Sequence, residues 1–301
     1  MSTVLAADIG GTNIRAAVVK NGMIEAEIHS RIELGDRNLS ENELIERLSA
    51  FFSNILDKRG DIVAIGAGFP GFFLGTSGHL VASPNLPNLH QIDLATQLSN
   101  HLRIPVRIQN DALCAAIGEH RFGSGVGATN LLHVTLGTGI GGGLILNNAP
   151  YTGESGMAME FGHLRVAHSE HARPCGCGGR GCVEAYASAT AITERYFEVT
   201  GDRISTEGIY NRARNGDDDA KSTIESAGSY LGMAIAEAIK LLDIHTVTMS
   251  GGLTGAWPLL HPAATKAMED NLIPPLKSKV RILQSTLNDQ AGILGAAVLT
   301  V

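Results

Sequence analysis

Apolar residues fall into short runs in the first part of the chain, and glycines or turn residues separate the runs. Residues 4–9 form an apolar run that ends at Gly10-Gly11-Thr12, and residues 14–19 are apolar again. Asn21-Gly22 favours a tight hairpin turn into a third strand over residues 24–31. The pattern predicts a strand, a glycine loop, a second strand and a hairpin.

The hydrophobic period then changes to that of a helix. Ser40 and Glu43 have the spacing of a capping box, and the apolar residues that follow recur on one helical face: Leu44, Leu48, Phe51, Phe52 and Ile55. Further elements are expected as strands over residues 62–67 and 106–109 and as helices over residues 94–102 and 112–120.

The same order of elements begins again at residue 131. Residues 131–136 predict a strand, residues 137–142 a glycine loop and residues 143–146 a returning strand. Later elements are expected as helices at about 183–199, 218–242 and 258–271 and from about 288, and as strands at 246–250 and 279–283. The repetition predicts a duplicated α/β domain with a cleft between its halves.

The length and composition are consistent with this organisation. With 301 residues, of which 44% are hydrophobic, the chain can bury a large core, and this length usually divides into two lobes. No apolar run approaches the roughly 18 residues of a membrane span, and the first residues lack the features of a signal peptide. We therefore expect a cytoplasmic protein without a membrane partner. A net charge of −7 argues against nucleic acid as a partner.

Three of the four cysteines lie in one glycine-rich stretch, Cys175-Gly-Cys177-Gly-Gly-Arg-Gly-Cys182, which follows His163. One imidazole and three thiols make a complete tetrahedral ligand set for a structural zinc ion, and the glycines allow the thiols to converge. A disulfide or free core cysteines are the alternatives, but three clustered thiols cannot all pair with one another. His168 and His171 compete with His163 for the fourth position.

The second glycine loop, Gly137-Thr-Gly-Ile-Gly-Gly142, formally satisfies the GxGxxG pattern of dinucleotide-binding proteins. In those proteins the loop opens into a helix, whereas residues 144–146 predict a hairpin strand, so an NAD site is disfavoured. The sequence contains no GxxxxGK motif followed by Ser or Thr, which excludes a P-loop. Two glycine loops, each with a threonine after a buried strand, instead predict a site that embraces a nucleotide phosphate tail. Ordinary glycine turns are the alternative.

The chain resembles the ROK family of sugar kinases and sugar-responsive repressors from Asp8 to the last helix. The resemblance is carried by Glu160-Phe-Gly-His163, by the cysteine motif that continues to Glu184, and by Asn110-Asp111-Ala112. It implies an α/β, duplicated actin/Hsp70/hexokinase-like (ribonuclease H-like) fold with two lobes around a cleft. We place a smaller lobe at residues 1–112 with the closing helix 288–301, and a larger lobe with the zinc loop at residues 113–287.

The same resemblance implies an activity. It is the ATP-dependent phosphorylation of a hexose by a hexokinase or glucokinase, with glucose to glucose 6-phosphate as the leading reaction. N-acetylglucosamine, N-acetylmannosamine, fructose and allose are alternative acceptors. Mg²⁺, a structural Zn²⁺ and a homodimer are also implied. A sugar-sensing regulator without catalysis is a further alternative, but it would need an N-terminal helix-turn-helix domain, and the first strand begins within a few residues of Met1.

Residue roles follow from matching the family motifs. Asp111 matches the general base that accepts the proton of the attacking sugar hydroxyl, although an aspartate here also suits a helix cap. The positions that match sugar-binding residues are Gly71, Asn85, Asn110, Asp111, Glu160, His163 and Glu184. The positions that match nucleotide and Mg²⁺ binding are Asp8, Gly10, Gly11, Thr12, Asn13, Gly137, Thr138, Gly139, Gly251 and Gly252.

Two further points concern the stretch around Glu160. The resemblance gives His163 a second role, as a zinc ligand together with Cys175, Cys177 and Cys182, so that the metal shapes the acceptor site and performs no chemistry. Met159 occupies a position where the family usually has glycine. This departure bears on the shape of the sugar pocket.

Overall fold

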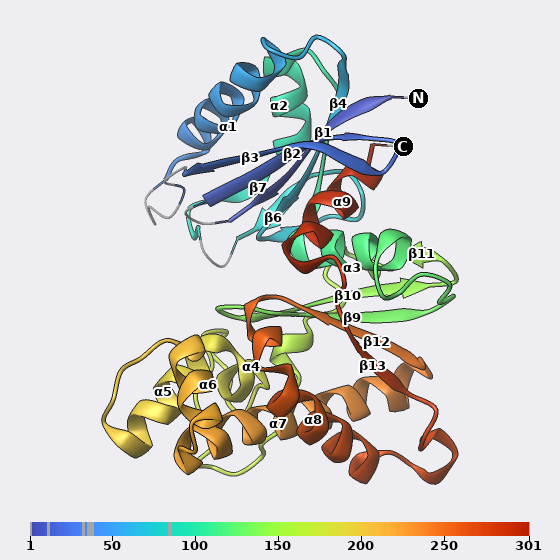
Figure 1. Cartoon of the computed structure of the whole chain (residues 1–301). Helices are drawn as coiled ribbons and strands as arrows, with labels where there is room; N and C mark the ends of the chain where they lie inside the picture. The colour runs from blue at the N-terminus through green and yellow to red at the C-terminus, as the bar shows by residue number, and fades with distance from the viewer. Residues whose placement is uncertain (1, 11–12, 32–33, 35–38, 84–85, 301) are drawn as a thin grey trace. The chain divides into compact units, whose positions relative to one another are not determined.

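The structure is a computed structural model that describes residues 2–10, 13–31, 34, 39–83 and 86–300 (Figure 1). Contacts divide the chain into two compact units. Unit 1 contains residues 1–129, 143–159 and 289–301, and unit 2 contains residues 130–142 and 160–288. The two units are groups of residues in contact with one another and are not the lobes expected from the sequence. The division into lobes at residue 112 stays a prediction.

A five-stranded sheet forms the centre of unit 1, with the order β3-β2-β1-β4-β8. The first three strands pair antiparallel, and β4 and β8 continue the sheet parallel to β1. The first hairpin reverses between Gly10 and Asn13, and the second reverses at Asn21-Gly22, where both residues have positive φ. The strands are β1 (Thr3–Ile9), β2 (Asn13–Lys20), β3 (Met23–Arg31), β4 (Ile62–Phe69) and β8 (Val106–Asn110).

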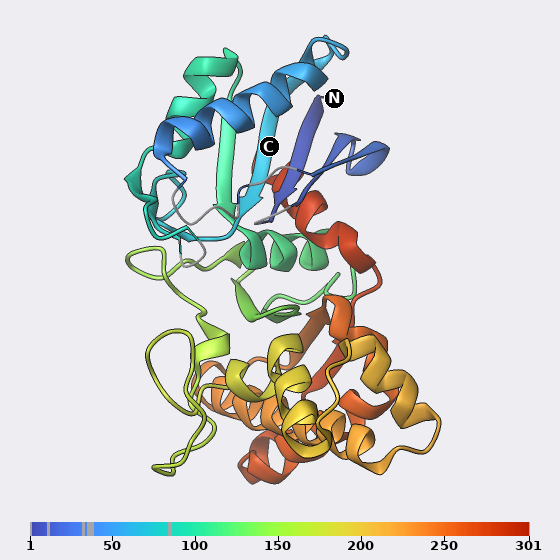
Figure 2. The same cartoon turned by 90° about the vertical axis from the view of Figure 1, so that its left-hand side faces the viewer.

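Helices cover both faces of this sheet, as Figures 1 and 2 show. Leu5, Ala7 and Ile9 point to the face that packs with α1 (Glu41–Leu56) and α2 (Leu94–Leu102) in one buried core. The alternate residues of β1 point the other way, because side chains alternate along a strand. On that face lies α9 (Ala291–Val298), which contacts β1 and β4.

The start of α1 confirms the predicted capping box. The Glu43 amide donates to Ser40 Oγ at 3.4 Å, and the Ser40 amide donates to Glu43 Oε2 at 2.9 Å. These bonds satisfy two of the orphan amides of the first turn and fix where the helix begins.

Helix α3 (Asp111–Phe122) follows β8 directly and crosses α9 at glycine contacts. A Cβ added to Gly295 would lie 1.7 Å from the Cys114 carbonyl oxygen, and one added to Gly118 would lie 2.0 Å from that of Ala291. The absence of side chains at these two positions therefore lets the backbones touch. Unit 1 also contains a small antiparallel sheet that the sequence pattern did not predict: β5 (Phe72–Phe73), β6 (Leu80–Ala82) and β7 (His90–Ile92).

A second five-stranded sheet has the order β11-β10-β9-β12-β13, which repeats the order of the first sheet. β10 pairs antiparallel with β11, whereas β12 lies parallel to both β9 and β13. Two sheets with the same strand order confirm the predicted duplication. The strands are β9 (Leu131–Leu136), β10 (Ile140–Leu146), β11 (Ala149–Pro150), β12 (Thr246–Ser250) and β13 (Arg281–Gln284).

The helices of unit 2 pack mainly against one another. The longest, α7 (Asp218–Leu242), lies along α8 (Trp257–Asn271), and Gly228 and Gly232 make the close contact possible (Figure 1). One helix expected at 183–199 is two in the structure, α4 (Glu184–Ala187) and α5 (Ala189–Thr200), because Ser188 is extended and caps α5. Helix α6 (Thr206–Arg214) was not predicted. Among the described residues, no helix has the length and apolar character needed to cross a membrane.

Candidate functional site

Asp8 lies near the end of β1, on the side of the sheet that faces α9. Arg15 Nη2 donates to Asp8 Oδ2 at 2.6 Å, and the other terminal nitrogen of Arg15 lies 3.1 Å from Asp289 Oδ2. The Gly292 backbone lies close to the carboxylate, since a Cβ there would come within 3.4 Å of Asp8 Cγ. The carboxylate is thus held at the carboxyl end of the central strand, next to the first glycine loop.

A backbone bond joins the described residues on either side of the first glycine loop. The Gly10 amide donates to the Asn13 carbonyl at 2.8 Å and so connects the end of β1 with the start of β2. Gly11 and Thr12, which we also expect to bind nucleotide, lie outside the described residues, and so does Asn85.

The junction of β8 and α3 carries Asn110 and Asp111. Asn110 is the cap of α3, because its Oδ1 accepts from the Leu113 amide at 3.0 Å. Its Nδ2 donates to the Gly71 carbonyl at 3.1 Å, which brings two predicted sugar-binding residues together. Asp111 is therefore the first residue of the helix and not its cap. A carboxylate in this position interacts favourably with the helix dipole.

The carboxylates of Asp8 and Asp111 both act on the thiol of Cys114, one turn further along α3. Burial raises the pKa of the Cys114 thiol, and the charges of Asp111 and then Asp8 raise it further.

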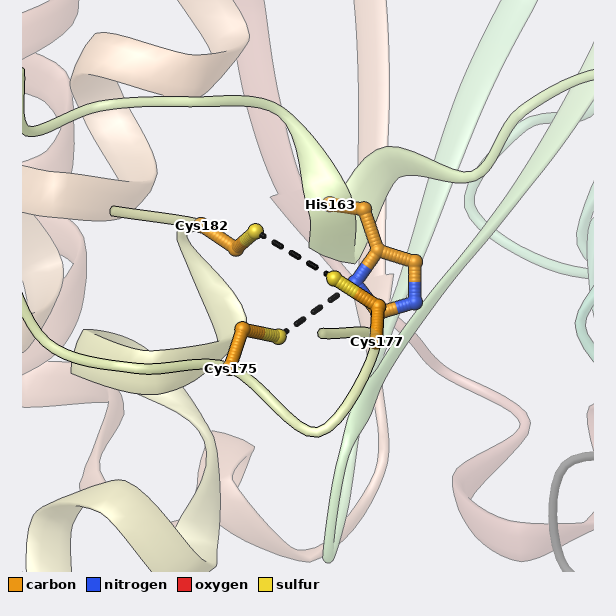
Figure 3. Close-up of side chains that lie close together, drawn as sticks. All are labelled: His163, Cys175, Cys177 and Cys182. Carbon is orange, nitrogen blue, oxygen red and sulfur yellow. Dashed lines mark hydrogen bonds between the residues drawn. The ribbon is translucent and has the colours of Figure 1, made fainter. Parts of the chain in front are cut away.

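In unit 2 the structure brings His163 together with the three clustered cysteines (Figure 3). Cys175 Sγ lies 3.6 Å from His163 Nδ1, Cys177 Sγ lies 3.7 Å from Cys182 Sγ, and all four ligand atoms lie within 4.8 Å of one another. All four cysteines of the chain are free thiols, so the disulfide alternative is wrong here. The competing candidates His168 and His171 are not members of this cluster.

These four side chains fit a tetrahedral metal ion. Ligands about 2.3 Å from a central zinc would lie roughly 3.7 Å from one another, close to the observed separations. Burial raises the pKa of the Cys182 thiol to about 12, with the neighbouring thiols adding to the effect, whereas a backbone hydrogen bond at Gly179 lowers the pKa of Cys177. Protons that these thiols hold would be released when a cation binds.

Glu160 lies next to the metal-ligand cluster. Its Oε2 is 3.8 Å from His163 Nε2, and burial raises the pKa of the carboxyl, with His163 opposing and Glu184 adding to the shift. The residue before it, Met159, has a φ of 72°, in the left-handed region that favours glycine. The backbone directly before Glu160 therefore has a conformation that costs a methionine conformational free energy.

Glu184 connects the cluster with the second glycine loop. Its Oε2 accepts from the Ile140 amide at 2.8 Å, and its Oε1 lies 3.9 Å from Cys175 Sγ. The loop leads from β9 into β10, a strand and not a helix, which confirms that the GxGxxG match lacks its Rossmann context. The sequence did not indicate the bond between Glu184 and Ile140. It also did not indicate the hydrogen bonds from the Ala189 amide to Gly137 and from Thr190 to Thr138.

Gly251 follows β12 and sits against β9. Its φ is 95°, and a Cβ would lie 2.3 Å from the Leu136 carbonyl oxygen, so only glycine fits. Gly252 is open, because a Cβ there would have no neighbour within 4 Å among the described residues. The loop after β12 is thereby placed beside the end of β9, where the second glycine loop begins.

The predicted site residues thus form two groups, one in each unit. Unit 1 holds Asp8, Gly10, Asn13, Gly71, Asn110 and Asp111, and unit 2 holds Gly137, Thr138, Gly139, Glu160, His163, Cys175, Cys177, Cys182, Glu184, Gly251 and Gly252. In unit 1, Asp8 and Asn110 lie at the carboxyl ends of β1 and β8, as is usual for ligand sites in α/β sheets.

Comparison with known proteins agrees with the fold and the motifs. The chain matches the ROK family over residues 4–301 and belongs to that family. It is 31% identical over 314 residues to a glucokinase of Halalkalibacterium halodurans, covering 97% of this chain and 93% of the relative. It is 30% identical over 302 residues to an N-acetyl-D-glucosamine kinase of Pasteurella multocida, covering 97% of each chain.

Among solved structures, a ROK family glucokinase from Streptomyces griseus in complex with glucose and AMPPNP superposes with a TM-score of 0.85. It is 29% identical in sequence, and the match covers 99% of each chain. This confirms the duplicated, actin-like fold. The family also contains regulators: a xylose repressor of Bacillus subtilis is 26% identical over 280 residues, covering 93% of this chain and 72% of the repressor.

Proposed function

We propose that the protein is an ATP-dependent hexose kinase that transfers the γ-phosphate to a sugar hydroxyl, with glucose as the leading acceptor and glucose 6-phosphate as its product. The observation that carries the proposal is the junction of β8 and α3. There Asn110 caps the helix and contacts Gly71, which leaves Asp111 at the first helical position as a half-buried carboxylate. Similarity to glucokinases over nearly the whole chain supports it.

Asp111 acts as the general base in this proposal. Phosphoryl transfer needs an in-line acceptor, neutralisation of phosphate charge and one carboxylate near the hydroxyl. Asp111 takes the proton of the attacking hydroxyl, while Asn110 at the end of β8 and Gly71, which follows β4, orient the sugar. Asp8 is the residue that would hold Mg²⁺, which neutralises phosphate charge when bound. Arg15 keeps the Asp8 carboxylate in place.

The nucleotide is bound by glycine loops. Gly10 and Asn13 with the adjoining Gly11 and Thr12 form one loop, and Gly137, Thr138 and Gly139 form the other. The loop at Gly251 and Gly252 contributes to the adenosine side. Backbone amides without side chains can approach phosphate oxygens closely, which is why glycine recurs in these loops.

Glu160, His163 and Glu184 are the acceptor-binding residues of unit 2 in this proposal, and Asn110 and Asn85 are those of unit 1. Carboxylates and amides suit the vicinal hydroxyls of a pyranose because they accept or donate in pairs. A zinc ion held by His163, Cys175, Cys177 and Cys182 is structural in this proposal, since four protein ligands leave no open position for water. The zinc ion would hold in place the loop that carries the sugar-binding side chains.

A sugar-responsive regulator is the second candidate, because a xylose repressor also matches this chain. A panel of sugars in a coupled ADP-release assay separates the two functions. The panel contains glucose, N-acetylglucosamine, N-acetylmannosamine, fructose and allose at equal concentrations with Mg·ATP. Sugar-dependent ADP release, fastest with glucose, is expected. Binding of a sugar without ADP release from any member of the panel would favour the regulator.

A further inference from the structure

Ile140, which follows Gly139 in the second glycine loop, lies between two segments that each supply metal ligands. On one side Glu184, two residues after Cys182, accepts the Ile140 amide at 2.8 Å. On the other side Gly162, next to His163, packs against the Ile140 carbonyl, since a Cβ there would lie 2.2 Å from that oxygen. Both polar groups of the Ile140 backbone therefore face segments whose positions a bound metal would fix.

The start of α5 holds the rest of the loop. The Ala189 amide donates to the Gly137 carbonyl at 2.9 Å, and Thr190 Oγ1 donates to the Thr138 carbonyl at 2.9 Å. We call these two bonds and the Glu184–Ile140 bond the loop clamp. The clamp uses two carbonyls and the Ile140 amide, and it leaves the amides of Thr138 and Gly139 outside its bonds.

Glu184 fits closely between the loop and the cysteines. Its Oε1 lies 3.9 Å from Cys175 Sγ, and its Oε2 lies where a Cβ on Gly139 would approach to 2.5 Å. A shift of the ligand segments would move this carboxylate and with it the amide that it holds. The metal-ligand cluster and the glycine loop are thus connected through a few direct contacts within unit 2.

We propose that the loop clamp couples the metal centre to nucleotide binding, so that occupancy of the Cys/His cluster sets the affinity for nucleotide phosphates. The inference rests on the proposed function, in which this loop binds phosphate. Its physical basis is preorganisation: a loop that must be ordered on binding loses affinity by the fraction of time it spends in other conformations. Glu184 and Thr190 act here as positioning residues.

Calorimetric titration of the metal-loaded, full-length protein with Mg·ADP in the absence of sugar tests the clamp. Glu184→Ala should weaken Mg·ADP binding roughly tenfold, the scale of one lost hydrogen bond to a charged group. Glu184→Gln keeps an oxygen that can accept the Ile140 amide and should recover most of that loss. Thr190→Val should weaken binding severalfold. Thr193→Val is the matched control, because Thr193 bonds to carbonyls of its own helix, and it should bind as the wild type does.

A second set of titrations tests the role of the metal. It uses Cys177→Ser, which removes an exposed ligand, and the zinc content of the variant is measured at the same time. This change should weaken Mg·ADP binding in the wild-type background and add little in the Glu184→Ala background, because coupled residues give non-additive effects. Circular dichroism checks that each variant is folded. If Cys177→Ser does not fold, the Glu184 and Thr190 series alone decides whether the clamp sets nucleotide affinity.

Unchanged Mg·ADP affinity in Glu184→Ala, or equal losses from Cys177→Ser in both backgrounds, would overturn the inference while leaving the kinase proposal intact. A wild-type protein that binds sugar but no Mg·ADP would instead overturn the proposed function. Glu160→Ala helps to distinguish a failure of the loop-clamp inference from a failure of the proposed function. The Glu160 carboxylate lies beside His163 and is not part of the loop clamp. The variant should weaken sugar binding and leave Mg·ADP binding at the wild-type value.

Discussion

Single side chains held by one or two partners carry most of the proposed chemistry. Asp8 is held by Arg15, Asn110 by the Gly71 carbonyl and the Leu113 amide, and Glu184 by the Ile140 amide. Each of these polar groups is fixed by a bond to backbone or to an opposite charge, so its position does not depend on a bound sugar or nucleotide. We therefore expect a single substitution at one of these side chains to have a specific and measurable effect.

Asp111→Asn should lower kcat by about 10² or more while leaving the fold and sugar affinity nearly intact. The amide has the same size but cannot accept the hydroxyl proton. Steady-state kinetics with saturating Mg·ATP, together with a sugar titration of the variant, measure both quantities. Near-normal turnover would show that Asp111 is not the base.

His133 makes the stability of unit 2 sensitive to acid. It is fully buried, its ring nitrogens lie 2.8 Å from Thr248 Oγ1 and 3.0 Å from Ser250 Oγ, and burial lowers its pKa to about 3. Above pH 6.5 both the folded and the unfolded chain carry a neutral ring. Between pH 6.5 and about 3 only the unfolded chain takes the proton, so folding stability falls as the pH falls.

The expected loss from this residue is about 2 kcal/mol on going from pH 6.5 to pH 5. Denaturant unfolding at several pH values measures it, with His133→Gln as the comparison. The variant starts from a lower stability at neutral pH, but its free energy of unfolding should change less with pH. Parallel curves for the two proteins would mean that His133 does not carry the acid sensitivity.

At the scale of elements, the strand and helix pattern was largely predictable from the sequence. The hairpins at Gly10 and Asn21-Gly22, the capping box of α1 and the extent of α7 follow from local periods and turn residues, and the structure has them all. The break at Ser188 and the helix α6 were missed. Ser188 lies within an otherwise continuous helical pattern. Helix α6 has only one fully buried residue, so its sequence shows no helical period of apolar positions.

The contacts of the site were harder to predict than its members. The three cysteines of the metal-ligand cluster were identified from their type and spacing, and the resemblance to the ROK family favoured His163 over His168 and His171 as the fourth ligand. The bond between Glu184 and Ile140 joins residues 44 positions apart, and no local pattern indicates it. Similarly, the packing of Gly162 on Ile140 depends on where the fold places the two loops.

The second glycine loop offers a variant whose effect is confined to ligand binding. A Cβ on Gly137 would have no described neighbour closer than 4.0 Å, so Gly137→Val should fold normally. We expect weaker Mg·ATP binding with little change in sugar binding, because the added branches occupy space that phosphate oxygens need. Separate calorimetric titrations with the two ligands make the measurement. Equal losses for both ligands would point to a disturbed fold.

The crossing of α3 and α9 offers the opposite case, a glycine needed for packing. In Gly295→Ala the new methyl would lie 1.7 Å from the Cys114 carbonyl oxygen, so the helices must separate. This overpacking should destabilise the protein by about 2 kcal/mol or more. Gly60→Ala, in open space within the same unit, is the control and should be nearly neutral. Thermal or denaturant unfolding of both variants settles the comparison; similar stabilities would contradict the packing explanation.

At the scale of the whole molecule, the site residues are divided between two units, and the chain contains two sheets with the same strand order. Unit 1 contributes carboxylates and the first glycine loop, and unit 2 contributes the second loop and the metal-ligand cluster. The duplicated strand order explains why a glycine loop follows the first strand of each sheet. The fourth cysteine, Cys114, is buried in unit 1, whereas the three that join the cluster belong to unit 2.

The purified protein should contain about one zinc ion per chain, measured by elemental analysis after exhaustive dialysis. Cys177→Ser should lose most of it, since three ligands bind far more weakly than four. His171→Ala is the control and should retain it, because His171 is exposed and pairs with Glu170 outside the cluster. Retention of a full equivalent by Cys177→Ser would contradict the ligand assignment.

The most direct test of the proposed activity follows the products of one reaction. The wild-type protein is incubated with Mg·ATP and glucose, and phosphorus NMR quantifies ADP, inorganic phosphate and sugar phosphate over time. We expect ADP and a hexose 6-phosphate in equal amounts, with little inorganic phosphate and with no ADP when sugar is omitted. ADP formed with inorganic phosphate at the same rate with or without sugar, or no turnover with any sugar of the panel, would contradict the proposal.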